Sequence, residues 1–89
     1  MTLQEREARA CAIIDSMTEE LRDISLYLHD NPELGLNEHK AVKIIYQFLE
    51  THNFTSQVGL TDYPELQTAL RGDHNHDARH KIAFLGEYD

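Results

Sequence analysis

The chain has 89 residues, 40% of them hydrophobic and 27% charged, which is the composition of a globular protein and not of a disordered segment. Sixteen acidic against eight basic residues give a net charge of −8, which repels phosphate backbones and anionic lipid headgroups. We therefore expect neither nucleic acid nor membrane as a partner. A chain of this length buries only about two-thirds of its unfolded surface, so its core is marginal without a partner.

Cysteine usage and apolar runs bear on location. The single cysteine, Cys11, excludes an internal disulfide framework and favours a reduced, intracellular setting. The charged residues 1–7 lead into no apolar signal core, and no apolar run approaches the roughly twenty residues that cross a bilayer. We expect a cytoplasmic protein. Cys11 is expected inside a helix among apolar neighbours, where it behaves as a small hydrophobic residue.

The first predicted element is one long amphipathic helix over residues 4–30, because apolar residues recur there at spacings of three and four. The stripe comprises Ala10, Ile13, Ile14, Met17, Leu21, Ile24 and Leu28. The helix should end near Asp30, since Asn31 precedes a proline and is pushed out of the helical region. His29 lies in the last turn, where it suits the helix dipole; a role as a general acid or base is the alternative.

A compact connection over residues 31–37 leads to a second predicted helix. Gly35 is the residue expected to take a positive φ in this turn. Asn37 is the predicted N-cap, and Asn53 is expected to end the helix in a left-handed conformation. The predicted buried face comprises Ala41, Ile44, Ile45, Phe48 and Leu49.

Strand-like segments follow at residues 54–58, 66–70 and 82–85, with a turn region at 59–64 and a polar loop at 72–80. The last strand is apolar at consecutive positions, which suits burial on both faces. The fold class we expect is α/β, with two amphipathic helices followed by strands. Because so few strands cannot protect their own edges, residues 1–89 are interpreted as an incomplete part of a layered α/β domain.

The polar loop contains residue types that bind metals. His74, His76 and His80, together with Asp73 and Asp77, are ligands that zinc or nickel accept. Their spacing matches no defined site, so we interpret the loop as a solvated connector and keep a metal-buffering loop as an alternative.

Four acidic residues are further candidates. Glu33 and Glu38 flank the turn before the second helix, and they could cap or tie it or act as catalytic acids. Glu87 and Asp89 directly follow a predicted buried strand, at the end of a sheet where ligands bind in open α/β folds. Either they belong to a site, since an unpaired carboxylate is costly near a core, or they are simply exposed.

Three segments resemble one enzyme family. Residues 29–35, H-D-N-P-E-L-G, followed by Glu38 and Ala41, resemble the "H-x-x-P-E-L-G … E-x-x-A" start of the aminoacylase and carboxypeptidase-type metallopeptidases, in their amidohydrolase branch. Residues 66–70 resemble its "L-x-T-A-F" strand, and residues 82–89 its "I-A-F-L-x-E-Y-D-A-L-P". The last segment is most similar to β-alanyl-lysine-type dipeptidases and aminobenzoyl-glutamate hydrolase subunits.

The resemblance covers about residues 16–89 in consistent order, and it implies a hydrolase of amide or peptide bonds in dipeptides or N-acyl amino acids. Such enzymes bind two divalent, zinc-type metal ions. In the wider family a strand ends in a metal-binding His, a spacer and an Asp; Glu87 stands at the His and Asp89 at the Asp. The resemblance therefore makes Asp89 the candidate catalytic-site residue, behind the metal ligands, with Glu87 and Tyr88 lining its approach.

No metal ligand or cofactor is assigned within these residues. The branch's "G-H-x-C-G-H" ligands, its catalytic glutamate and its inserted dimerisation domain would all lie beyond Asp89. We therefore expect an N-terminal portion of a metallopeptidase catalytic domain that is inactive by itself. Asn53, where a glycine is usual, and Leu70, where phenylalanine is common, depart mildly from the family pattern.

An alternative from another class is a non-catalytic binding or regulatory module. Its apolar helix faces and open sheet edge could pair with a full-length relative. A homo-oligomer is the other partner expected for the chain.

Overall fold

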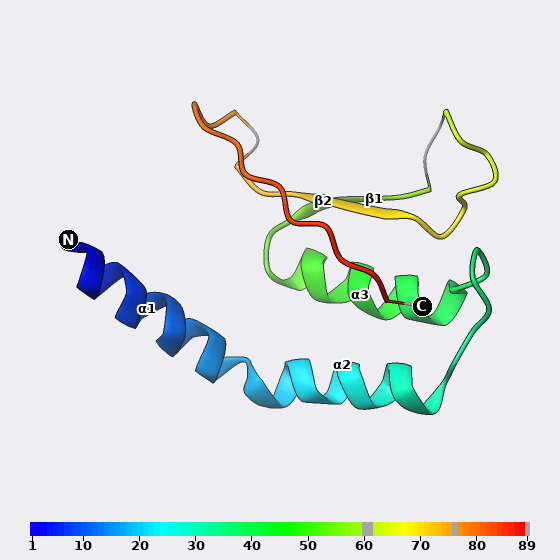
Figure 1. Ribbon diagram of the computed structural model, residues 1–89, viewed down its shortest axis with the longest axis horizontal. Coiled ribbons are helices and arrows are strands. Elements are labelled where there is room, and N and C mark those ends of the chain that lie inside the picture. The colour runs from blue at the N-terminus through cyan, green and yellow to red at the C-terminus, as the bar shows by residue number, and fades with distance from the viewer. Residues whose placement is uncertain (60–61, 76, 89) are drawn as a thin grey trace. The chain divides into compact units, whose positions relative to one another are not determined.

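The computed structural model describes residues 1–59, 62–75 and 77–88 and divides the chain into two units, residues 1–30 and residues 31–89. Across the described residues it contains three helices and one two-stranded antiparallel sheet, which confirms a mixed α/β fold at this coarse level (Figure 1). The elements are α1 (Leu3–Ser16), α2 (Thr18–Asp30), α3 (His39–Thr51), β1 (Thr55–Val58) and β2 (Leu70–Asp73).

The first unit consists of α1 and α2, so the prediction of one continuous helix over residues 4–30 is wrong. A capping box begins α1: the backbone N–H of Glu5 donates to the Thr2 hydroxyl, and the Glu5 carboxylate accepts from the Thr2 N–H. The break falls at Met17, beside the Ser16 hydroxyl, which donates to the Ile13 carbonyl at 2.5 Å. A side chain that binds its own backbone competes with the helical ladder, which the apolar periodicity could not reveal.

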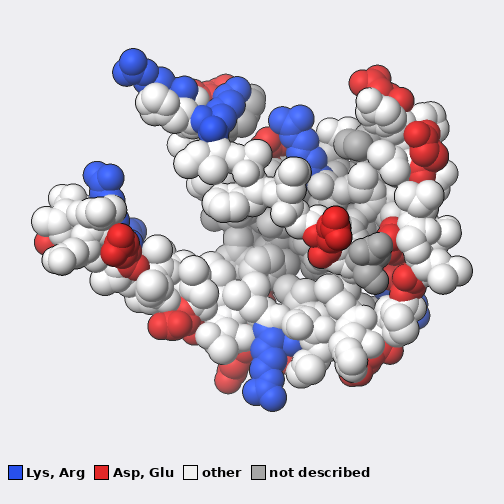
Figure 2. Space-filling model, in the orientation of Figure 1, with Lys and Arg blue, Asp and Glu red and all other residues white. Residues whose placement is uncertain are grey.

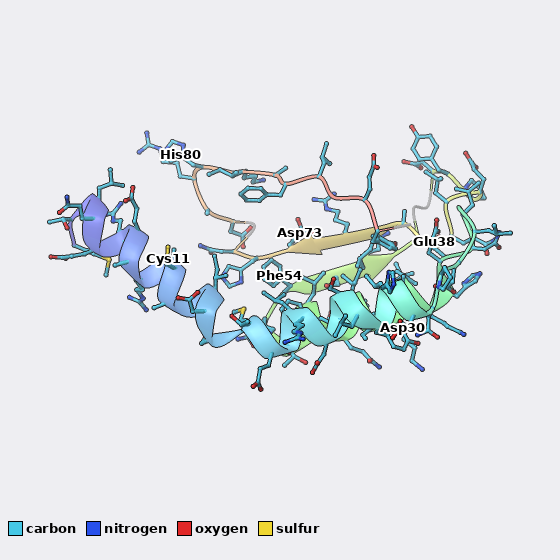
Figure 3. All side chains as sticks on the ribbon, turned by 60° about the horizontal axis from the view of Figure 1, so that its bottom comes forward. Cys11, Asp30, Glu38, Phe54, Asp73 and His80 are labelled. Atoms are coloured by element: carbon cyan, nitrogen blue, oxygen red, sulfur yellow. The ribbon has the colours of Figure 1, made fainter. Side chains whose placement is uncertain are left out.

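The apolar stripe of the first unit stays largely exposed. No residue of α1 or α2 is buried, and Ile14 is 58% exposed. Met17, Ile24 and Leu28 are half-buried. Cys11 lies within α1, as expected, but its side chain is exposed (Figure 3). Two successive helices offer no second layer to cover the stripe, which explains the difference.

The second unit is a helix packed on a hairpin. Strands β1 and β2 pair antiparallel, with Thr55 opposite Asp73 and Val58 opposite Leu70, and α3 contacts both strands. Ala41 and Val42 of α3 are buried, at 4% and 6% exposure. The remaining residues of the predicted face of α3 are half-buried, so its orientation agrees with the sequence: Ile44, Ile45, Phe48 and Leu49.

The turn before α3 differs from the prediction by one residue. Leu36, not Gly35, takes the positive φ, at 69°, inside a turn closed by the Asn37 N–H donating to the Leu34 carbonyl. The N-cap position belongs to Glu38 and not to Asn37, because the turn uses Asn37 as its last residue. Asn53 has a φ of 67° after the end of α3, as predicted.

Only the first of the three predicted strands matches the structure. Residues 54–58 contain β1, whereas residues 66–69 form turns and the next strand begins at Leu70. Turn hydrogen bonds, such as the Leu66 N–H donating to the Tyr63 carbonyl, use the backbone groups that a strand would pair. Residues 82–85 form no strand and are exposed. A continuous apolar run becomes a buried strand only between two layers, and the described second unit provides one helix and one hairpin.

Among the described residues, no helix is both long enough and apolar enough to cross a membrane.

Candidate functional site

Three segments that are distant in the sequence meet at Thr68. The Thr68 hydroxyl donates to Oε2 of Glu38 at 2.5 Å, across 30 residues of sequence. The Tyr88 hydroxyl donates to the backbone carbonyl of the same threonine. Thr68 is 3% exposed and Glu38 8%, while Tyr88 is half-buried. We call these three residues the Glu38–Thr68–Tyr88 cluster; each comes from one of the three segments that resemble the metallopeptidase family.

The two carboxylate oxygens of Glu38 bind different segments of the chain. Its Oε1 accepts from the backbone N–H of Leu36 at 2.9 Å, so the carboxylate joins the turn before α3 to Thr68. The hydrogen bond from the Thr68 hydroxyl is the main reason that the pKa of Glu38 is lowered below its ordinary value, against the opposing effect of burial. Glu38 therefore holds its place as an ionised acceptor at neutral pH.

Glu33 caps α3 from five residues before the N-cap. Its carboxylate accepts from the backbone N–H of Lys40, at 2.9 Å to Oε2, and from that of Ala41, at 3.0 Å to Oε1. These are orphan donors of the first helical turn, where a negative charge also suits the helix dipole. The bond from Lys40 is the main cause of the lowered pKa of Glu33. The expectation that Glu33 and Glu38 cap or tie this turn is confirmed.

Tyr88 acts as the donor that secures the end of the described chain. Burial, and secondarily the negative charge of Glu38, raise the pKa of Tyr88 above its ordinary value. The phenol is therefore protonated at neutral pH and can donate to Thr68.

The two acidic residues predicted as site candidates at this end have different outcomes: Glu87 is exposed, and Asp89 lies outside the described residues. The assignment of Asp89 to a catalytic site stays a prediction.

The start of the polar loop contacts both β2 and the residues just before β1. Asp73 forms a two-point pair with Arg71, at 3.0 and 3.2 Å. The His74 ring lies 5.3 Å from the Phe54 ring, centroid to centroid, and its Nδ1 is 3.4 Å from the Asn53 carbonyl oxygen. His80 is exposed, and His76 lies outside the described residues.

No group of three or more histidine, cysteine or acidic side chains comes together for a metal within residues 1–59, 62–75 and 77–88. His29 lies in the last turn of α2, as predicted, and is exposed.

A shallow, open hollow of about 250 Å³ lies beside the end of β1, and the residues of the Glu38–Thr68–Tyr88 cluster do not line it. Its lining comprises Gln57, Val58, Gly59, Tyr63, Pro64, Leu66 and Gln67.

Sequence reasoning missed Thr68 as the residue that joins the three segments. It lies within the L-Q-T-A-L motif, but as one position of a predicted strand it carried no sign of its partners. The two hydrogen bonds connect residues 30 and 20 positions apart, and no local pattern encodes contacts over such distances.

Acidic and basic side chains are interspersed over the face shown in Figure 2, in a chain with a net charge of −8.

A scan against protein-family models found no match, and searches of curated proteins and of solved structures found no similar protein either. The metallopeptidase resemblance therefore rests on its motif residues.

Proposed function

We propose that the chain is the N-terminal portion of the catalytic domain of a metal-dependent hydrolase that cleaves amide or peptide bonds in dipeptides or N-acyl amino acids. The observation that supports this proposal is the Glu38–Thr68–Tyr88 cluster. Residues from all three motif segments meet at Thr68, as parts of one catalytic domain would.

The role we propose for the cluster is to hold the residue that precedes the candidate site. Tyr88 is adjacent to Asp89 in the sequence, and its hydroxyl is bound to a residue that Glu38 fixes in turn. Catalytic groups must be held within a fraction of an ångström by supporting hydrogen bonds. In this proposal, Asp89 supports a metal ligand and binds no metal itself.

Two zinc-type ions would supply Lewis-acid chemistry to such an enzyme. The residues described here do not fit that role by themselves, because no three potential ligands come together. The ligand set of the proposed enzyme would be contributed by other residues, and the 89-residue chain alone is proposed to be inactive.

The first experiment is to read the transcript past the codon for Asp89. We expect an in-frame continuation into Ala-Leu-Pro and then Gly-His-x-Cys-Gly-His. The product of that reading frame should hydrolyse members of a dipeptide and N-acyl amino acid panel, should lose activity on dialysis against a chelator, and should regain it with zinc. A stop codon at that point, or a product with no such motif, would contradict the proposal.

A second experiment tests the 89-residue chain itself. Zinc is titrated into this chain in a calorimeter to measure binding, and the chain is assayed on the same substrate panel with zinc present. The assay should show no metal-dependent hydrolysis. Hydrolysis by this chain would refute its proposed inactivity. Zinc binding lost in the double variant His74→Ala, His76→Ala would assign the polar loop a metal-buffering role.

The second candidate function is a non-catalytic module that pairs with a full-length relative. The exposure of apolar residues 82–85 favours it, because such a segment is suited to adding a strand to another sheet. A stable monomer with one cooperative unfolding transition would support an independent module. Aggregation that a full-length relative relieves would support a portion of a larger domain.

A further inference from the structure

An apolar segment of the second unit lies in solvent along its whole length. Ile82 is 83% exposed, Phe84 94% and Leu85 100%, and the segment forms neither helix nor strand (Figure 1). Isolated exposed apolar residues are ordinary, but three within four positions are a feature of interaction sites.

The segment is tethered at both sides. It follows β2 through the polar loop, and beyond it the Tyr88 hydroxyl is bound to the Thr68 carbonyl. Tethering reduces the conformational freedom that the segment would lose on pairing with another chain, which favours association.

The apolar segment has a positive charge on its N-terminal side and a negative charge on its C-terminal side. Lys81 directly precedes the apolar residues, and Glu87 follows them; both are exposed. If two copies lie antiparallel and centred on Phe84, Lys81 of each copy stands opposite Glu87 of the other, because both residues are three positions from the centre. A parallel, in-register pair would place lysine against lysine and glutamate against glutamate, which is unfavourable.

The same antiparallel register matches the apolar side chains. Successive side chains of a strand point to opposite faces, so Phe84 of one copy meets Phe84 of the other. On the same face Ile82 lies opposite Gly86, which leaves room for the isoleucine side chain to lean toward the phenylalanine pair. The opposite face brings Ala83 against Leu85, flanked by the Lys81–Glu87 pairs. The pairing is symmetric, as a two-fold interface between identical chains requires.

We propose that residues 81–87 form a self-association edge, through which two copies of this chain pair as antiparallel strands centred on Phe84. The proposal uses no metal chemistry and does not depend on the hydrolase function proposed above. The complementary charges select a second copy as the occupant of this segment.

The test is a charge exchange followed by sedimentation velocity of the 89-residue chain over a range of concentrations. We expect a reversible monomer–dimer equilibrium in the unmodified chain. Lys81→Glu alone, or Glu87→Lys alone, replaces two attractive pairs per dimer by two repulsive ones and should weaken dimerisation about tenfold. The double variant should restore it, and so should an equimolar mixture of the two single variants.

Matched controls separate local pairing from net charge. Lys43→Glu and Glu65→Lys make the same charge changes at exposed positions elsewhere and should leave the dimerisation constant unchanged. Phe84→Ser should abolish the dimer without lowering the unfolding midpoint of the monomer, because this side chain is 94% exposed. A chain that stays monomeric at all concentrations, or an association that the double exchange fails to restore, would overturn the proposal.

Discussion

The two units of this protein use the same amphipathic principle with opposite results. The first unit carries a long apolar stripe, yet no residue of α1 or α2 is buried. The second unit buries Ala41 and Val42 of α3, because a hairpin packs against that helix. Periodicity thus identifies the face that can be buried, while burial itself requires a second layer.

The largest expected effect comes from shortening an apolar side chain, which should be costly in the second unit and nearly neutral in the first. Val42→Ala should lower the free energy of unfolding by about 2 kcal/mol, because it removes two methyl groups from a side chain that is only 6% exposed and leaves a cavity in their place. Ile14→Ala, at a 58%-exposed position of α1, should change it by less than about 0.5 kcal/mol. Urea denaturation followed by circular dichroism measures both. Equal losses would show that the stripe of the first unit is buried in solution.

A change in the Glu38–Thr68–Tyr88 cluster tests what holds the second unit together beyond apolar packing. Thr68→Val removes the hydroxyl that donates to Glu38 and should cost about 1–2 kcal/mol of unfolding free energy. Thr68→Ser keeps the hydroxyl and should recover most of that loss. Amide exchange of α1 and α2 should be the same in both variants. If the valine variant is as stable as the unmodified chain, the cluster is not a structural tie.

Acid should destabilise the second unit. The pKa values of Glu33 and Glu38 are lowered below the ordinary 4.5, so these carboxylates stabilise the fold fully above that pH. The stabilisation is lost as the pH falls below 4.5 and through the two lowered pKa values. Urea midpoints measured between pH 7 and pH 2 should fall in that window, and Glu33→Gln should reduce the slope. A pH-independent midpoint would contradict the capping role of Glu33.

Alkali should act on the same unit through Tyr88, whose pKa is raised above 10.0. A raised pKa means that the protonated phenol is favoured in the folded state, so the stabilisation is present below pH 10 and is lost as the pH rises through the folded value.

The smallest effect concerns backbone strain in the turn before α3. Leu36→Gly should raise the unfolding free energy by about 0.5–1 kcal/mol, because glycine adopts a φ of 69° without steric cost. Gly35→Ala should be nearly neutral, since an added Cβ would meet Glu38 Oε1 only at 3.9 Å. Differential scanning calorimetry distinguishes the two. A destabilising Gly35→Ala, together with no gain in stability from Leu36→Gly, would favour the turn predicted from the sequence.

The sequence determined the local features whose causes are local. The apolar spacing of α3 placed its buried face, and Asn53 marked the end of that helix through its tolerance of a left-handed conformation. The acids around the turn were recognisable as capping groups for the same reason. The sequence also carried the motif residues that led to the proposed function.

Only the tertiary structure decided which of these features are joined. Thr68 was one position in a predicted strand, and its contacts with Glu38 and Tyr88 bridge 30 and 20 residues. Residues 82–85 had the pattern of a buried strand, but a strand is buried only where other layers cover it, and here they are exposed. Hydrogen bonds and layers between distant segments depend on the whole fold, so no window of neighbouring residues could specify them.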